Sequence, residues 1–328
     1  MDSRETETKT FREAIRDALR EEMQADEDVY LMGEDIAEYG GIFDVTDGLW
    51  EEFGDERVRR TPISEAGILG TGVGSAMTGT RPVVEIMFSD FIGVAFEQIM
   101  NQTAKLRYMH GGDLEMPLTI RTTEGAGTGS AAQHSGTIHT LFAHLPGLKV
   151  VVPGTPAAAK GLLKTSIRSN DPVLFFENKT IYAQDGEVPV DDDYTLPVGE
   201  AAVEREGDDV TVVATQRLVS ESLAAADALE DEISVEVIDP RSLYPLDADT
   251  IGESLQKTGR IVVADEGPLS YGTHAEIITR LVESEFFSLD APPERVGVPD
   301  VHIPYSTPLE NEVMPDRDDV TAAIRRIS

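Results

Sequence analysis

The apolar residues of the first half of the chain form two kinds of pattern that alternate. Short continuous runs have the length and composition of buried strands, and we place strands at 29–32, 82–88, 118–122, 149–152 and 172–177. Between them, spaced apolar positions predict helices at 11–23, after residue 65, at 91–109 and at 156–168. Strands that alternate with helices predict a mainly parallel sheet flanked by helices on both faces.

Start signals support three of these helices. Thr10 and Glu13 fit a capping box, and Thr155 is a cap followed by proline at the first helical position. Ser64 is placed as the N-cap of the helix after residue 65, so Glu65 falls in its first turn. The pair Gly111 and Gly112 is expected to stop the helix at 91–109.

The pattern is interrupted at 183–199, which has no usable period and is rich in Asp, Pro and Gly, and then restarts. We place strands at 210–214, 235–238 and 261–264, and helices near 220–229, 247–257, 275–285 and 320–327. The sequence therefore predicts an α/β chain with a first domain at 1–183, a linker at 184–198 and a smaller parallel domain at 199–328.

The amino-acid composition limits the classes of molecule that the chain is expected to bind. Lys plus Arg number 27 against 61 for Asp plus Glu, and the formal net charge of −34 disfavours nucleic acid and anionic membranes. Acidity spread along the chain is typical of proteins from salt-loaded cytoplasms, with docking to a basic partner as the second interpretation. Cysteine is absent, and the polar N-terminus and short apolar runs predict a cytoplasmic protein without a membrane span.

The stretch from Thr61 to Phe91 holds the main candidate chemistry. A carboxylate at a helix start has an ordinary electrostatic explanation, but Glu65 lies among apolar residues and therefore needs a partner, which a ligand could supply. The helix after it is rich in glycine, and Gly70 and Gly74 share a face suited to close contact with another helix. The strand at 82–88 delivers the residues before Phe91 to its carboxyl edge, where α/β proteins bind ligands.

Glycine and histidine residues after the strand at 118–122 allow other interpretations. The loop G125-A-G127-T-G129 invites a dinucleotide site, but Ser130 stands at the third glycine position and the next strand ends in proline. His134, His139 and His144 are five apart, which matches no zinc spacing, so we expect no metal ligands in this chain. A lone His134 is more often structural, although its Gly-rich loop raises the odds of a function.

Six segments together, TPISEAGI, EIMFSDF, NQTAKLRYM, AAQHS, PGLKVVVP and NDPVLFFE, resemble the β subunit of heterotetrameric E1 components of 2-oxo acid dehydrogenase complexes. The resemblance covers nearly the whole chain. It implies a transketolase-type pyrimidine-binding domain, a transketolase C-terminal-type domain, and thiamine diphosphate as cofactor.

Residue roles follow from that resemblance. It implies that Glu65 hydrogen-bonds N1′ of the aminopyrimidine, that Phe91 stacks near the ring, and that His134 lies at the substrate and lipoyl end. Ile63 and Met87 would line the pocket, with Glu34 as a nearby acid. The cofactor would carry the difficult chemistry while the protein positions it and excludes water.

One part of such a site is missing. Enzymes of this class bind the Mg2+ diphosphate through a GDG segment, which this chain lacks and which belongs to the α subunit in the family. The resemblance therefore implies an α2β2 heterotetramer and an E2 lipoyl acyltransferase as a further partner. The family often has an Asp near position 169 at a monovalent-cation site, whereas this chain has Ser169, with Asp171 two residues on, so binding of K+ stays open.

The substrate within this family is expected to be pyruvate, with acetoin or a branched-chain 2-oxo acid as alternatives. The AAQHS region and EIMFSDF favour the pyruvate and acetoin enzymes. Two other classes remain: a nicotinamide-dependent oxidoreductase, supported only by the broken glycine loops, and a non-catalytic scaffold subunit.

Overall fold

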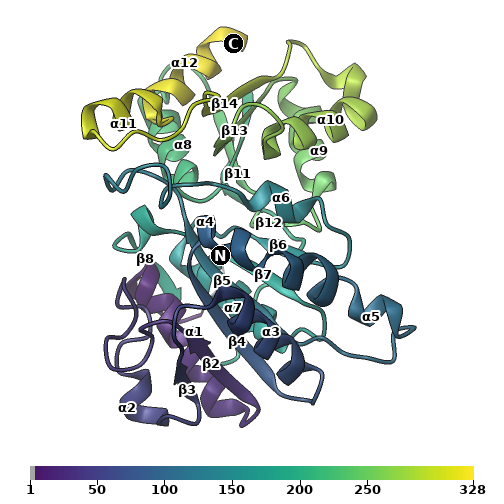
Figure 1. Cartoon of the computed structure of the whole chain (residues 1–328). Coiled ribbons are helices and arrows are strands. Elements are labelled where there is room, and N and C mark those ends of the chain that lie inside the picture. The colour runs from purple at the N-terminus through teal and green to yellow at the C-terminus, as the bar shows by residue number, and fades with distance from the viewer. Residues whose placement is uncertain (1–3) are drawn as a thin grey trace. The chain divides into compact units, whose positions relative to one another are not determined.

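The computed structural model describes residues 4–328, and the chain forms two compact units (Figure 1). Unit 1 contains the chain up to residue 124 together with 141–151 and 155–198. Unit 2 contains 125–140, 152–154 and 199–328. The segment that carries His134 thus belongs to unit 2, although the strand before it belongs to unit 1. Each unit is built on a mainly parallel sheet, which confirms the predicted fold class.

The parallel strands of unit 1 are adjacent in the order β6, β7, β5, β4, β2, β3. Nearly every residue of the central strands is buried, as expected for a sheet covered on both faces. The strands are β6 (Lys149–Val151), β7 (Val173–Asn178), β5 (Thr119–Glu124), β4 (Arg81–Phe88), β2 (Val29–Gly33) and β3 (Val58–Arg60).

Helices of unit 1 begin where the sequence predicts. Helix α1 (Phe11–Ala25) starts with the capping box of Thr10 and Glu13, and α7 (Pro156–Arg168) starts behind Thr155. These two helices pack together, and their apolar faces share one core with β2 and β7. On α3 (Glu65–Ala76), Gly72 lies against Val84 and Leu118 of the sheet layer. The other helices that begin in the first half are α2 (Leu49–Phe53), α4 (Ser89–Ile92), α5 (Leu106–Met109) and α6 (His139–Ala143).

The continuous helix predicted at 91–109 is wrong. After α4, the chain forms a 3-10 turn at Gly93–Ala95 and a π-helix at Gln98–Thr103 before α5. In the π-helical part, the N–H of Ala104 donates to Ile99 O, five residues earlier, at 2.9 Å, and the Thr103 hydroxyl donates to Gln98 O. These bonds widen the helix, and apolar spacing does not register such a change.

An antiparallel ribbon joins the two ends of unit 1. Strand β1 (Thr6–Thr10) pairs with β8 (Asp185–Pro189), with Thr8 opposite Glu187. Strand β8 lies inside the stretch that the sequence marked as a linker. Farther along this stretch, Leu196 covers Gly161 of α7, where an added Cβ would lie 2.8 Å from Leu196 Cγ.

Unit 2 has a sheet in the order β14, β13, β10, β11, β9, in which β9 is antiparallel to β11 and the other pairs are parallel. Alternate residues face opposite layers, so Val212 packs with α8 and α12 while Val213 packs with α9 and α10. The strands are β9 (Ala202–Arg205), β10 (Val210–Ala214), β11 (Val235–Asp239), β13 (Ile261–Pro268) and β14 (Glu294–Val298), with a short β12 at Ser242–Tyr244.

The helices of unit 2 match the predicted ones within a few residues and add one. They are α8 (Arg217–Ala228), α9 (Ala248–Thr258), α10 (Thr273–Glu285), α11 (Thr307–Val313) and α12 (Arg317–Ile327), with a 3-10 turn at Phe286–Ser288. Among residues 4–328, no helix is both long and apolar enough to cross a bilayer.

Candidate active site

The carboxyl ends of β2, β3 and β4 meet at one edge of the unit 1 sheet. Met32 of β2 pairs with Arg59 of β3 on one side and with Val84 of β4 on the other, all in parallel. The segments that leave these strands therefore emerge at the same edge. These segments carry four of the site residues that the sequence singled out in this unit, Glu34, Ile63, Glu65 and Phe91, and the fifth, Met87, lies at the end of β4.

Glu65 is the first residue of α3 and is half-buried. Ser64 is the N-cap, as expected, but its side chain makes no capping hydrogen bond. The Ser64 hydroxyl instead lies beside Gly67, where an added Cβ would be 2.8 Å from it. Because no side chain from the cap satisfies the first N–H groups of the helix, a negative charge at this end is favoured.

Glu34 is the second acid at this edge. Burial raises the pKa of the Glu34 carboxyl, and the negative charges of Glu65 and Asp35 raise it further. Glu34 and Glu65 therefore lie within electrostatic reach of each other. Asp35 has a left-handed backbone with φ of 55°, so the chain turns sharply at this strand exit. The edge therefore places two neighbouring carboxyl groups where a ligand could hydrogen-bond to them.

Apolar side chains lie next to the two acids in the chain. Ile63, two residues before Glu65, is 80% exposed, and Met87 and Phe91 are half-buried. The ring of Phe91 packs edge-on against Phe88 with centroids 5.9 Å apart. The Thr123 hydroxyl donates to Met87 O at 2.5 Å, which fixes the end of β4. An edge that combines carboxylates with apolar surface suits a planar heterocycle with polar ring atoms.

A buried ionic cluster lies within the sheet behind this edge. Arg121 of β5 donates two hydrogen bonds to the Glu177 carboxylate, at 2.6 and 2.8 Å, and a third to Glu85 at 2.8 Å. The Tyr182 hydroxyl also donates to Glu177, at 2.7 Å. Strand register brings the cluster together, because Glu85 is directly opposite Arg121. None of these residues was predicted from the sequence, because Glu85, Arg121 and Glu177 look like ordinary strand positions and Tyr182 belongs to no motif.

The cluster is electrostatically linked to the edge. Burial raises the pKa of Glu85, while the positive charge of Arg121 opposes that rise. The charges of Glu177 and Glu34 add to the rise, so the acid at the sheet edge and the acid in the cluster influence each other. A single guanidinium thus faces two carboxylates, those of Glu85 and Glu177.

In unit 2, the Gly-rich segment that contains His134 is tied to α11. The Glu310 carboxylate accepts hydrogen bonds from the N–H groups of Gly127 at 2.8 Å and Gly129 at 3.0 Å. Both glycines have positive φ, 104° and 66°. These are the donors that a dinucleotide phosphate would need, and a buried carboxylate already occupies them. The geometry therefore argues against a nicotinamide site here.

The three histidines have different surroundings. His134 is half-buried, and its backbone N–H donates to Ala131 O at 3.4 Å. His139 is fully buried, with Nε2 3.1 Å from Asp265 Oδ2, whereas His144 is exposed and belongs to unit 1. Within residues 4–328, no group of three or more His, Asp or Glu side chains is arranged to hold a metal ion.

The segment at Ser169 is held by cationic side chains. Arg81 donates to the carbonyl oxygens of Ile167 at 3.1 Å and Ser169 at 3.2 Å, and also to Asn170 Oδ1 at 2.7 Å. The Lys149 ammonium lies 3.2 Å from the Ser169 hydroxyl and 3.3 Å from the Asp171 carboxylate. Several oxygen atoms of this segment therefore already face positively charged side chains.

Comparisons with known proteins define the class. A family model described as the transketolase pyrimidine-binding domain matches residues 7–184, and one for the transketolase C-terminal domain matches 199–320. A solved structure of a split-gene transketolase, an inactive β4 tetramer, superposes with a TM-score of 0.78 and 27% identity, covering 97% of both chains. The chain is therefore a transketolase-type protein in both of its units.

Sequence relatives are closer. The β subunit of acetoin:2,6-dichlorophenolindophenol oxidoreductase from Bacillus subtilis (strain 168) is 46% identical over 94% of both chains. The pyruvate dehydrogenase E1 β subunit of Rhizobium meliloti (strain 1021) is 46% identical over 98% of this chain and 70% of its own length. The 2-oxoisovalerate dehydrogenase β subunit of B. subtilis is 44% identical over 97% and 98%. The chain belongs to the family of E1-type β subunits of 2-oxo acid and acetoin dehydrogenases.

Proposed function

We propose that this chain is the β subunit of an E1 component that oxidatively decarboxylates a 2-oxo acid with thiamine diphosphate and transfers the acyl group to the lipoyl group of an E2 component. One observation carries the proposal. The domain matched by the pyrimidine-binding model presents a pair of acids, Glu34 and Glu65, beside apolar side chains at the carboxyl edge of its parallel sheet.

The residues at this edge fit the pyrimidine half of the cofactor. Glu65 would hold a hydrogen bond at N1′ of the ring, and Phe91 would stack near it. Ile63 and Met87 would cover the apolar edge and exclude water. Glu34, whose pKa is raised by burial and by the charge of Glu65, would be the nearby acid of the site. When bound, thiamine diphosphate supplies the electron sink for the loss of carbon dioxide.

We assign His134 to the substrate and lipoyl end of the reaction. An imidazole can donate or accept a proton near neutral pH, which suits a group that meets a carboxylate substrate and then a thiol product. The half-buried position of His134 leaves part of its side chain accessible. Its catalytic role rests on the family resemblance and is tested below.

The diphosphate half of the site is assigned to an α subunit. The chain has no GDG segment for the Mg2+ diphosphate, so Mg2+ would be held by the partner. We propose an α2β2 heterotetramer and expect Gly74 on α3 to lie in an interface, because an added Cβ there meets nothing within 4 Å in this chain. We do not include K+, given the cationic side chains around Ser169.

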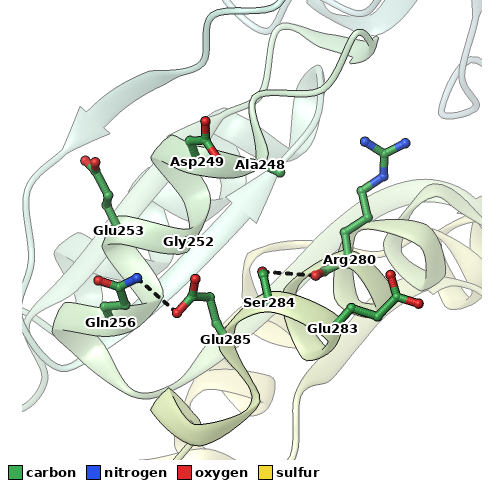
Figure 2. A pocket seen from close by; sticks show the side chains of 9 residues that line it. All are labelled: Ala248, Asp249, Gly252, Glu253, Gln256, Arg280, Glu283, Ser284 and Glu285. Carbon is green, nitrogen blue, oxygen red and sulfur yellow. Dashed lines mark hydrogen bonds between the residues drawn. The ribbon is translucent and has the colours of Figure 1, made fainter.

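Docking to E2 is assigned to the acidic unit 2. Between α9 and α10, a groove of about 700 Å3 is lined by four acids, Asp249, Glu253, Glu283 and Glu285, with Arg280 as the only base (Figure 2). Such a surface suits a basic domain, and its attraction should weaken with salt, so in a cytoplasm of high salt apolar contacts would have to carry more of the docking. Charge reversal of Glu253 and Glu283 that leaves E2 binding unchanged at low salt would refute this assignment.

Pyruvate is our first choice of substrate, because the AAQHS and EIMFSDF segments are closest to the pyruvate and acetoin enzymes. The overall identities of 46%, 46% and 44% to the acetoin, pyruvate and 2-oxoisovalerate relatives do not separate the three. We further propose a cytoplasmic protein adapted to high salt, on the basis of its charge of −34.

The test is an assay of the purified chain with thiamine diphosphate and Mg2+, with and without its α subunit. The panel contains pyruvate, 2-oxoisovalerate and acetoin. We expect turnover only with the α subunit, and fastest with pyruvate. Full turnover by the isolated chain would contradict the shared site, and absence of turnover on all three substrates in the assembled enzyme would contradict the proposed activity.

A further inference from the structure

The segment 125–140 of unit 2 is anchored near both of its ends by a buried carboxylate from elsewhere in the same unit. Glu310 of α11 holds the first part and Asp265 of β13 holds the last part. Both acids are 0% exposed. A buried carboxylate is costly unless its oxygens are hydrogen-bonded, so each anchor loses stabilising contacts if the segment leaves its place.

The first anchor binds backbone groups. Glu310 Oε1 accepts from Gly127 N and Oε2 accepts from Gly129 N, so one carboxylate spans three residues of the segment. The left-handed φ of both glycines turns these N–H groups toward it. No basic side chain is needed, because two backbone donors satisfy the charge.

The second anchor binds a side chain. Asp265 Oδ2 lies 3.1 Å from His139 Nε2 and accepts from the Thr215 hydroxyl at 2.6 Å, while Oδ1 accepts from Gly267 N at 2.7 Å. Burial alone would raise the pKa of Asp265, but His139, the Thr215 hydrogen bond and the charge of His274 outweigh it and hold the pKa well below its usual range. His139 also contacts the Thr273 hydroxyl at 3.1 Å.

The part between the anchors has little regular structure of its own. Gly125 N donates to Gly136 O at 3.3 Å, which closes a loop around His134. Ala131 has φ of 58°, a strained value for a residue with a side chain. Neither helix nor strand orders residues 125–138, so the conformation of this loop depends on its anchors.

We propose that Glu310 and Asp265 are positioning residues that hold this loop in the conformation in which His134 acts. The proposal rests on the proposed function for the role of His134, but the anchoring itself is a property of unit 2 alone. Neither acid touches substrate or cofactor in this account. Each acts through the loop, Glu310 through its backbone and Asp265 through His139.

The experiment compares Glu310→Gln with Glu312→Gln in the assembled enzyme. Both changes remove one negative charge from α11, but Glu312 is exposed. Hydrogen exchange of the amides at 125–136 should be faster in Glu310→Gln and unchanged in Glu312→Gln. A displaced catalytic group costs up to about a hundredfold, so kcat of Glu310→Gln should fall by about tenfold to a hundredfold while KM stays within about threefold.

Asp265→Asn releases the other anchor and should likewise lower kcat while KM stays nearly unchanged. This second variant keeps the test valid if Glu310→Gln does not fold. Unchanged exchange at 125–136 in the folded variants would overturn the anchoring. Faster exchange with wild-type kcat would overturn the positioning role. Failure of the proposed function shows differently, as absence of turnover in the assembled wild-type enzyme, and failure of the His134 assignment shows as wild-type turnover of His134→Gln. In both cases the exchange data would still report on the anchors.

Discussion

Asp239 is a buried acid at the end of β11 in unit 2 whose protonation is coupled to folding. Its Oδ1 accepts from Arg241 N at 2.7 Å and its Oδ2 accepts from Gly154 N at 3.1 Å. Burial raises its pKa to about 7, and the charge of Glu204 adds to the rise, against the effect of the two backbone hydrogen bonds. The folded protein therefore binds this proton more tightly than the unfolded chain does.

The raised pKa of Asp239 determines how its contribution to folding stability changes with pH. Because the pKa is raised on folding, the contribution of Asp239 is most favourable below its ordinary value near 3.8 and is lost as the pH rises toward about 7. We expect Asp239→Asn to flatten the fall in melting temperature between pH 5 and pH 8 relative to wild type. The control is Asp231→Asn, an exposed acid of the same unit. An identical pH profile in Asp239→Asn and wild type would contradict the assignment.

At the residue scale, local sequence predicted some site positions and missed others for a physical reason. Phe91 was located because it follows the strand at 82–88, and Glu65 because it begins a helix among apolar residues, while Glu34 came from the family resemblance. Their catalytic and binding roles stay predictions. The bonds from Arg121 to Glu177 and from Gly127 to Glu310 join residues 56 and 183 positions apart, and no local pattern encodes such a pairing.

Two of the glycines of helix α3, Gly72 and Gly74, have different surroundings. An added Cβ on Gly72 would lie 2.8 Å from Val84 Cγ2 and 3.3 Å from Leu118 Cδ1, both buried. An added Cβ on Gly74 meets nothing within 4 Å. The first glycine is thus required by packing within the unit, and the second is not.

This contrast gives a matched pair of variants. In the isolated chain, Gly72→Ala should destabilise by about 1–3 kcal/mol through overpacking. Gly74→Ala should stabilise by about 0.5–1 kcal/mol, because alanine is the better helix former. In the assembled enzyme we expect that gain to be lost, since α3 would then face another subunit. Denaturant unfolding and subunit association are measured for both variants. If Gly74→Ala raised the free energy of unfolding equally in the isolated chain and in the assembled enzyme, Gly74 would not lie in an interface.

At the element scale, N-capping residues predicted the starts of helices correctly, whereas the spacing of apolar residues did not always predict the type of helix. The capping box of α1 and the Thr155 cap of α7 lie where the sequence placed them. The π-helix within 91–109 was missed because its bonds change the period locally. Strands β1 and β8 were missed because they pair only with each other and bury little apolar surface. Such a ribbon depends on long-range pairing, which pattern analysis does not detect.

The charge of −34 is a property of the whole molecule and predicts how it responds to salt. Exposed carboxylates repel one another, and the Debye length falls from about 30 Å at 0.01 M to about 3 Å at 1 M salt. We expect the melting temperature to rise with KCl over this range. Choline chloride at equal ionic strength should give a similar rise, because Arg81 and Lys149 occupy the segment where K+ would bind. A flat or falling melting temperature would contradict the repulsion argument.

The central claim is that the unit 1 edge forms the pyrimidine half of a thiamine-diphosphate site in which Glu65 is essential. The most direct measurement is turnover of Glu65→Gln in the assembled enzyme at saturating cofactor, with its melting temperature. The matched control is Glu51→Gln, which changes an exposed first-turn acid of α2. The change to glutamine keeps size and hydrogen-bonding capacity but removes the charge, and positioned acid or base groups are worth about 10² to 10⁴ in rate. For Glu65→Gln we predict a melting temperature within a few degrees of wild type and at least about a hundredfold loss of turnover. For Glu51→Gln we predict that neither quantity changes. Near-normal turnover of Glu65→Gln would contradict the assignment of Glu65 to the site.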